Sequence, residues 1–140
     1  MSNAAIMAPV FALIALTFAT LLKVAGSRYM AVKLREVKLS DVALSSQGWS
    51  IKVKKVSNNY NNQLQLPILF YIAIGFFILL AKVDAVAVVL AWAFVASRYV
   101  HTFIHIGSNN VGNRFFAFLF GSFMLATLWV WLALRFYVIG

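Results

Sequence analysis

Four apolar stretches, each about long enough to cross a bilayer, limit what this chain can fold into. A helix needs about 20 residues to cross a hydrocarbon layer of about 30 Å, and apolar runs of this kind begin near residues 6, 64, 85 and 115. Unpaired backbone groups are costly in lipid, so each run is predicted to be helical. The composition agrees, because 64% of the residues are hydrophobic and 11% are charged, against about 25% charged in soluble domains. We therefore expect an all-α membrane protein, a bundle of four transmembrane helices.

Polar residues between the apolar stretches set the expected boundaries. They predict helices at about residues 6–30, 58–81, 85–106 and 114–138, a loop at about 31–57, and a single domain over residues 1–140. A cleaved signal peptide is the competing interpretation of the first stretch, but Met-Ser-Asn supplies no basic start. Within the loop, Trp49 and residues 51–56 suit a segment that lies on the membrane surface. The chain has no cysteine, which excludes a disulfide framework, a thiolate metal site and a cysteine nucleophile.

The distribution of Lys and Arg predicts the orientation in the membrane. Seven of the twelve lie at the end of the first helix or between it and the second: Arg28, Lys33, Arg35, Lys38, Lys52, Lys54 and Lys55. Cytoplasmic loops carry such an excess, so both termini are expected on the non-cytoplasmic side. A net charge of +9 could also indicate nucleic acid, but these residues flank membrane helices, so lipid headgroups are the expected partner and nucleic acid is not. The short chain without a eukaryotic retention signal favours a bacterial inner membrane, although an endoplasmic reticulum protein would show the same polarity.

Two polar helix faces form the most informative pattern. Both follow the spacing i, i+3, i+4, i+7, which places four side chains on one face of a helix. They comprise Asn58, Asn61, Asn62 and Gln65 on the second helix, and Arg98, His101, Thr102 and His105 on the third. Counted outward from Val83 in the tight turn, Gln65 and His101 each lie 18 residues away, or about 27 Å along a helix. The two faces are therefore predicted to reach the same depth, where Arg114 and Arg28 can join them.

Each of these side chains has a structural and a functional interpretation. An arginine inside a membrane helix is costly, so Arg98 is a candidate for ligand contact, or it bonds to amides or helix-end carbonyls. The amides of the second helix are more simply explained by hydrogen bonds between helices. His101 and His105 could grip a metal from one helix face, but no cysteine or nearby carboxylate completes a zinc site, so we assign no metal. Pro67 is expected to kink the second helix where its polar face ends.

These residues resemble the MAPEG family, the membrane-associated proteins of eicosanoid and glutathione metabolism, which includes microsomal glutathione transferases and prostaglandin E synthase. The resemblance rests on the order of four helices, the basic first loop and three motifs. The motifs are residues 62–67 (Asn-Gln-Leu-Gln-Leu-Pro), residues 98–102 (Arg-Tyr-Val-His-Thr) and residues 105–107 (His-Ile-Gly) followed by Arg114. It spans the whole chain and is most specific from Arg98 to Arg114.

The resemblance implies a homotrimer with a site between neighbouring subunits on the cytoplasmic side. Glutathione would bind there, and Arg114 matches the arginine at the start of the fourth helix that stabilises the glutathione thiolate. A guanidinium favours an adjacent anion and so lowers the pKa of a thiol. Arg98 and His101 match a third-helix motif that would hold the ligand or position its neighbours. The implied function is a glutathione- or thiol-dependent transferase or isomerase acting on an apolar substrate.

The sequence also departs from the family enzymes. They carry an Arg and a Glu where this chain has Asn58 and Gln65, and several carry a tyrosine at the position of His105. Without the Arg, the site lacks a guanidinium that can bind the ligand's carboxylates through two hydrogen bonds. Without the Glu, it lacks a negative charge that can pair with the ligand's amino group. Two alternatives to glutathione chemistry therefore stay open. The crevice could accept another thiol or an anionic lipid-like ligand, or the protein could be a non-catalytic lipid-binding or accessory subunit of a larger membrane complex.

Overall fold

The computed structural model describes residues 1–140, which are helical apart from turns and loops. The helices are α1 (Asn3–Lys33), α2 (Leu39–Val42), α3 (Ile51–Asn62), α4 (Leu66–Leu79), α5 (Ala85–Ile106) and α6 (Val111–Tyr137). Four spans are long and apolar enough to cross a membrane: α1, α3 together with α4, α5, and α6. The prediction of an all-α chain with four membrane-spanning helices is thus confirmed.

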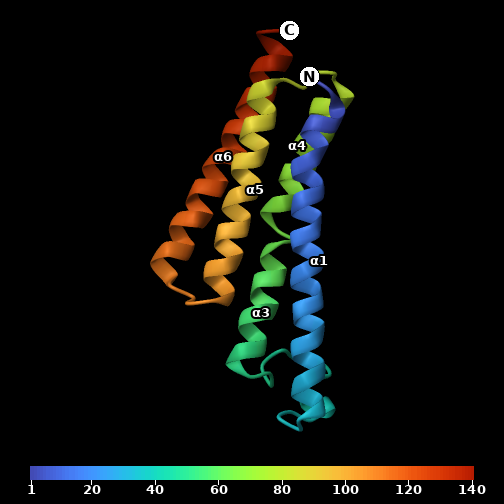
Figure 1. Ribbon diagram of the computed structural model, residues 1–140, viewed down its shortest axis with the longest axis vertical. Coiled ribbons are helices and arrows are strands. Elements are labelled where there is room, and N and C mark those ends of the chain that lie inside the picture. The colour runs from blue at the N-terminus through green and yellow to red at the C-terminus, as the bar shows by residue number, and fades with distance from the viewer.

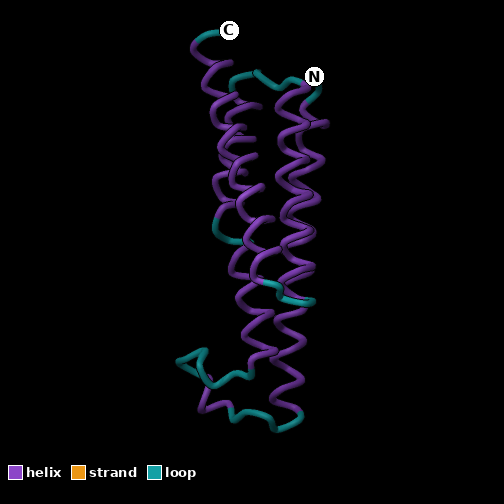
Figure 2. Tube along the Cα trace, turned by 90° about the vertical axis from the view of Figure 1, so that its left-hand side faces the viewer, coloured by secondary structure: helices purple, strands orange, loops and turns teal.

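The helices lie side by side in an elongated bundle, with both termini at one end and the loop around α2 at the other (Figures 1 and 2). The longest helix-to-helix packing joins α5 to α6, and α1 packs against α3, α4 and α5. One polar contact crosses between α1 and α5, where the Tyr99 hydroxyl donates to the carbonyl oxygen of Ala12 at 2.7 Å. Figure 1 also shows that α1 and α3 extend beyond the turn that joins α5 to α6.

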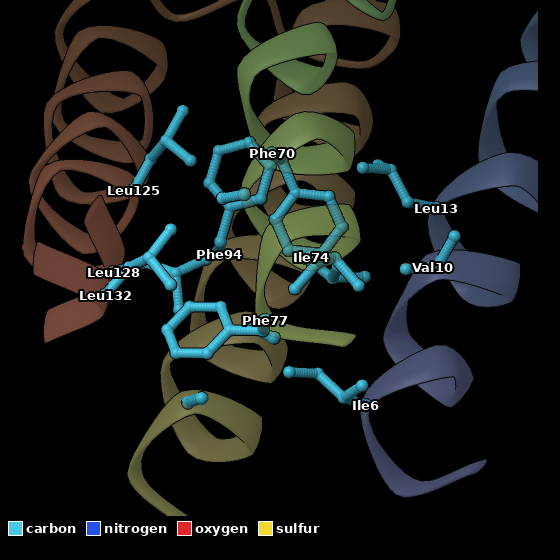
Figure 3. Close-up of a cluster of buried hydrophobic side chains, with 14 of the residues drawn as sticks. Ile6, Val10, Leu13, Phe70, Ile74, Phe77, Phe94, Leu125, Leu128 and Leu132 are labelled. Carbon is cyan, nitrogen blue, oxygen red and sulfur yellow. The ribbon is translucent and has the colours of Figure 1, made fainter. Parts of the chain in front are cut away.

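The apolar core occupies the half of the bundle that holds the termini. Side chains from α1 and α6 converge on the aromatic residues of α4 that lie between them (Figure 3). The rings of Phe70 on α4 and Phe94 on α5 stack with centroids 4.9 Å apart. Phe70, Phe77 and Phe94 are fully buried within the single chain. This close packing positions the second and third spans relative to each other and so sets the level of the polar residues they carry.

The second span is interrupted, and Pro67 accounts for the interruption. Helix α3 ends at Asn62, and α4 begins at Leu66 with the proline in its first turn. Proline has no backbone N–H and its ring clashes with the carbonyl four residues earlier, here that of Gln63. Between the two helices, Gln65 takes a non-helical conformation with φ −101° and ψ −101°. The kink predicted at Pro67 is a complete break of the helix.

The start of the second span and the path of residues 51–56 differ from the prediction. The span begins at Ile51 instead of residue 58, and the expected surface-lying segment is the first half of α3, which runs beside α1 (Figure 1). Val53 and Val56 are buried, and the Ser50 side chain caps the helix by accepting from the backbone N–H of Val53 at 3.4 Å. Burial of these two valines against the bundle favours a continued helix over a surface segment, because apolar area leaves water.

Candidate functional site

A polar pocket of about 480 Å³ lies where α3, α5 and the start of α6 meet. Side chains from all three elements line it: Asn58, Asn61, Asn62, Gln65, His101, His105, Val111, Arg114, Phe115 and Phe118. The structure therefore brings together six of the eight residues that the sequence singled out as site candidates. It also places the polar faces of the second and third spans at the same level, as the count from Val83 predicted.

The amide wall of the polar pocket comes from α3 and from the break after it. Asn58, Asn61 and Asn62 project from the helix, and Gln65 stands at the residue that precedes α4. Asn58, Asn61 and Gln65 are exposed in the single chain, so this wall faces outward. Carboxamides both donate and accept hydrogen bonds. The amide wall is neutral, and it can bind carboxylate, hydroxyl or amide groups of a ligand through hydrogen bonds.

The histidine wall comes from one face of α5. His101 and His105 are only 3% and 4% exposed, and their ring centroids lie 5.7 Å apart at an interplanar angle of 79°. The Nδ1 atom of each ring is buried and has no hydrogen-bond partner within the chain. Buried polar atoms are usually satisfied. The two rings therefore line the pocket, while these two nitrogens lie beneath its surface without a partner in the chain.

Arg114 reaches the polar pocket from the first turn of α6. Its Nη1 donates to the Asn109 side-chain oxygen at 3.0 Å, and Asn109 itself adopts a left-handed backbone with φ 52°. Asn110 then begins the helix, because its side-chain oxygen accepts from the backbone N–H of Asn113 at 3.1 Å. Lys55 fixes the start of this turn by donating to the Gly107 carbonyl at 2.6 Å. The turn between α5 and α6 is thereby built to hold the guanidinium at the edge of the pocket, beside the positive end of the α6 dipole.

The other two arginines predicted for the site do not line the polar pocket. Arg98 is 2% exposed and points into the bundle, where its Nη2 donates to the carbonyl of Asn62 at 3.1 Å. Asn62 is the last residue of α3, and carbonyls at a helix end lack the usual intrahelical donor. Of the two roles considered for Arg98, the observed contact is the helix-end carbonyl. Its charge still lies directly behind the amide wall.

Arg28 joins α1 to α3 instead of entering the polar pocket of its own chain. Its Nη2 donates to the Ser57 hydroxyl at 3.2 Å, and its guanidinium lies 5.4 Å from the ring centroid of Trp49. Trp49, expected to be an interfacial anchor, thus stacks on an arginine, a favourable cation–π contact. These partners keep Arg28 away from the amide face of α3, because Ser57 and Asn58 are successive helix residues that project about 100° apart.

The structure adds buried polar residues that the sequence did not single out. Gln63 is 1% exposed, and its Nε2 donates to the Thr102 hydroxyl at 2.9 Å, which joins the second span to α5. Asn59 is fully buried, and both of its side-chain polar atoms lack a partner within the chain.

The apolar wall of the polar pocket is also new, and Phe115 and Phe118 supply it. The signal for Gln63 was the threonine at a matching depth on the third helix, whereas the phenylalanines are indistinguishable in sequence from lipid-facing residues.

No carboxylate lines the polar pocket. The chain has three acidic residues, and all lie elsewhere. Asp84 is at the other end of the bundle with its Oδ2 3.1 Å from Nε of Arg135, while Glu36 and Asp41 follow α1 in the long loop. The charge at the pocket is therefore positive, from Arg114 in its wall and Arg98 behind it.

The four spans and the pocket at one end of the bundle define a multi-pass integral membrane protein. The family model for the MAPEG family matches residues 6–134, which is almost the whole chain. The chain belongs to the MAPEG family, and the resemblance seen in its motifs is thereby confirmed. Comparison with curated proteins and with solved structures gave no significant match.

Proposed function

We propose that this protein is a thiol-dependent transferase or isomerase that acts on an apolar substrate at the polar pocket, with glutathione or a related thiol as cosubstrate. The observation that carries the proposal is the position of Arg114. It stands in the first turn of α6, held by Asn109, at a pocket whose other walls are amides, histidines and phenylalanines. A fixed guanidinium and a helix N-terminus both favour an anion, so a thiol bound there would be held as its thiolate.

The walls of the pocket suit the two halves of such a reaction. The amides of α3 and Gln65 would hold the polar body of the thiol, and Phe115 and Phe118 would contact the apolar substrate arriving from the hydrocarbon. The thiolate sulfur then uses its electron pair to form a bond to an electrophilic carbon, and the leaving group departs with the pair of the bond that breaks. The thiol proton passes to water. Arg114 acts as the catalytic residue that stabilises the anionic sulfur before attack.

The outward face of the amide wall supports a homotrimer in which a second copy closes the pocket. Asn58, Asn61 and Gln65 are exposed in the single chain at a level where hydrocarbon or headgroups surround it. Exposed amides in lipid are costly, and membrane helices satisfy them by bonding to other helices. Cross-linking and mass measurement in detergent should give a trimer. A stable monomer or dimer would count against a shared pocket.

The expected orientation places the polar pocket on the cytoplasmic side of a bacterial inner membrane. The basic residues that predict this orientation lie on α1, on α3 and in the loop between them, at the end of the bundle opposite the termini (Figure 1). A reporter enzyme that works only outside the cytoplasm, fused after Gly140, should be active. Activity of a cytoplasmic reporter at that position would overturn the orientation.

Binding and conjugation by the purified protein test the proposed enzyme. Saturable binding of glutathione or related thiols, and their addition to an apolar electrophile, should be lost in Arg114→Leu. They should be retained in Arg35→Gln, which removes the same charge from the exposed loop. No saturable, Arg114-dependent binding or conjugation by any such thiol would refute the enzyme.

A second candidate function is a non-catalytic module that binds lipid or serves as an accessory subunit of a larger membrane complex. The amides at Asn58 and Gln65 favour it, because they stand in the pocket at positions where the family enzymes resembled by this sequence have an Arg and a Glu. Saturable binding of an anionic lipid without any thiol binding would support this alternative.

A further inference from the structure

Within one chain, the polar pocket has a cation that can pair with a negative ligand group but no acid that can pair with a positive one. Its ten lining residues include one cation, Arg114, and no acid. Glutathione carries two carboxylates and one free ammonium group, so it brings both signs of charge. A buried or half-buried charge is costly unless it is paired with an opposite charge. The ammonium group is the part of glutathione for which the pocket lacks a partner.

Three cations around the polar pocket add to the excess of positive over negative charge. Arg114 stands in the wall, and Arg98 lies behind the wall with its Nη2 3.1 Å from the Asn62 carbonyl. Lys55 lies at the turn that leads to Arg114, with its Nζ 2.6 Å from the Gly107 carbonyl. All three would repel a ligand ammonium and attract a ligand carboxylate. Amide oxygens in the wall could accept hydrogen bonds from an ammonium, but they would not cancel this repulsion.

The acidic residues of the chain are each held elsewhere. Asp84 lies at the far end of the bundle, where it caps α5 and pairs with Arg135. Glu36 lies in the loop after α1, beside a separate cavity that Ser50 and Lys52 also line. Asp41 belongs to α2, in the same loop. The pocket of the single chain therefore gains no carboxylate from a nearby segment.

We propose that the thiol held in the polar pocket bears carboxylate groups but no free ammonium group. This inference rests on the proposed thiol-dependent function and names its cosubstrate class: an anionic thiol whose amino group is absent or acylated. Gln65 is a neutral amide in the wall, at the break before α4, and this preference can be tested there. A carboxylate at this position would supply the missing partner for an ammonium.

The experiment compares two ligands that differ only in the amino group. The purified, membrane-reconstituted protein is titrated with glutathione and with its deamino analogue, in which hydrogen replaces the ammonium. The wild type should bind the deamino analogue about tenfold or more tightly than glutathione. Gln65→Glu should reverse the order, while Gln65→Asn, which stays neutral, should keep the wild-type order. Thermal unfolding without ligand checks that both variants fold.

The outcomes separate this inference from the proposed function. If glutathione binds as tightly as the analogue or more so, the inference is wrong while the thiol site stands. If neither thiol binds, both are refuted. A preference for glutathione that disappears in Glu36→Gln would overturn the inference in a specific way, because it would show that a neighbouring subunit supplies the carboxylate.

Discussion

Asp84 holds together the end of the bundle opposite the polar pocket, and its contacts give a stability prediction with a definite size. Its Oδ1 accepts from the backbone N–H of Ala87 at 2.8 Å and so caps α5. The Trp131 Nε1 of α6 donates to both carboxylate oxygens at 3.1 and 3.0 Å. The Arg135 Nε lies 3.1 Å from Oδ2, with the Arg135 and Asp84 side chains 22% and 24% exposed.

Asp84→Ala removes all three interactions, and we expect it to destabilise the protein by about 3 kcal/mol. An N-cap contributes about 1 kcal/mol, a hydrogen bond to a charged group about 1.5 kcal/mol, and a partly exposed ion pair about 0.5 kcal/mol. Asp84→Asn keeps an oxygen that can cap α5 and accept from the indole but loses the ion pair. It should therefore cost about 1 kcal/mol, since the remaining bonds become neutral.

The measurement is the free energy of unfolding in mixed detergent micelles, with a double-mutant cycle between Asp84→Ala and Trp131→Phe. The phenylalanine keeps the ring and removes the N–H, so the cycle should show a coupling of about 1 kcal/mol. Trp129→Phe is the matched control, because Trp129 packs edge-on against Phe76, with ring centroids 6.3 Å apart, and should be additive with Asp84→Ala. A cost below about 0.5 kcal/mol for Asp84→Ala, or additivity with Trp131→Phe, would refute the reasoning.

Three further substitutions follow from the structure. A Cβ added at Gly121 on α6 would overlap the Ser97 hydroxyl of α5, so Gly121→Ala should cost about 1–2 kcal/mol in unfolding free energy, and less in a Ser97→Ala background. Thr102→Val leaves the buried amide N–H of Gln63 without its acceptor and should cost about 1–3 kcal/mol in unfolding free energy. Adding Gln63→Leu removes the unpaired donor and should recover much of this cost. Equal costs for the single and double variants would contradict a buried hydrogen bond. Arg114→Lys keeps the charge but loses the planar guanidinium that donates to Asn109, so the rate of thiol conjugation should fall by about tenfold or more. A wild-type rate in this variant would remove Arg114 from the proposed mechanism.

Hydropathy and helical spacing predicted much of the arrangement. The four spans follow from the cost of unpaired backbone in lipid, which leaves helices as the available structure for apolar runs of this length. Counting from the tight turn at Val83 was enough to predict that Gln65 and His101 lie at one level, because helix rise is nearly constant. The structure places both in the wall of one pocket with Arg114.

Contacts between helices decided what the spacing left open. Periodicity assigns a side chain to a helix face, but it does not say which neighbour that face meets. Arg98 shares a face with His101 and yet turns into the bundle, because a helix-end carbonyl at Asn62 was there to accept its hydrogen bond. Arg28 was expected at the site and instead bonds to Ser57 of α3. The extension of the second span back to Ile51 likewise depended on burial of Val53 and Val56 in the bundle.

The sequence by itself determined that this is a four-span helical membrane protein, that Pro67 bends the second span, and that polar residues gather at one depth. These properties depend on composition, proline geometry and helix rise, which are local. Only the tertiary structure decided which of the polar residues line a common pocket. Side-chain burial and hydrogen-bond partners depend on which helices become neighbours, and that choice is made by packing of the apolar core around Phe70 and Phe94.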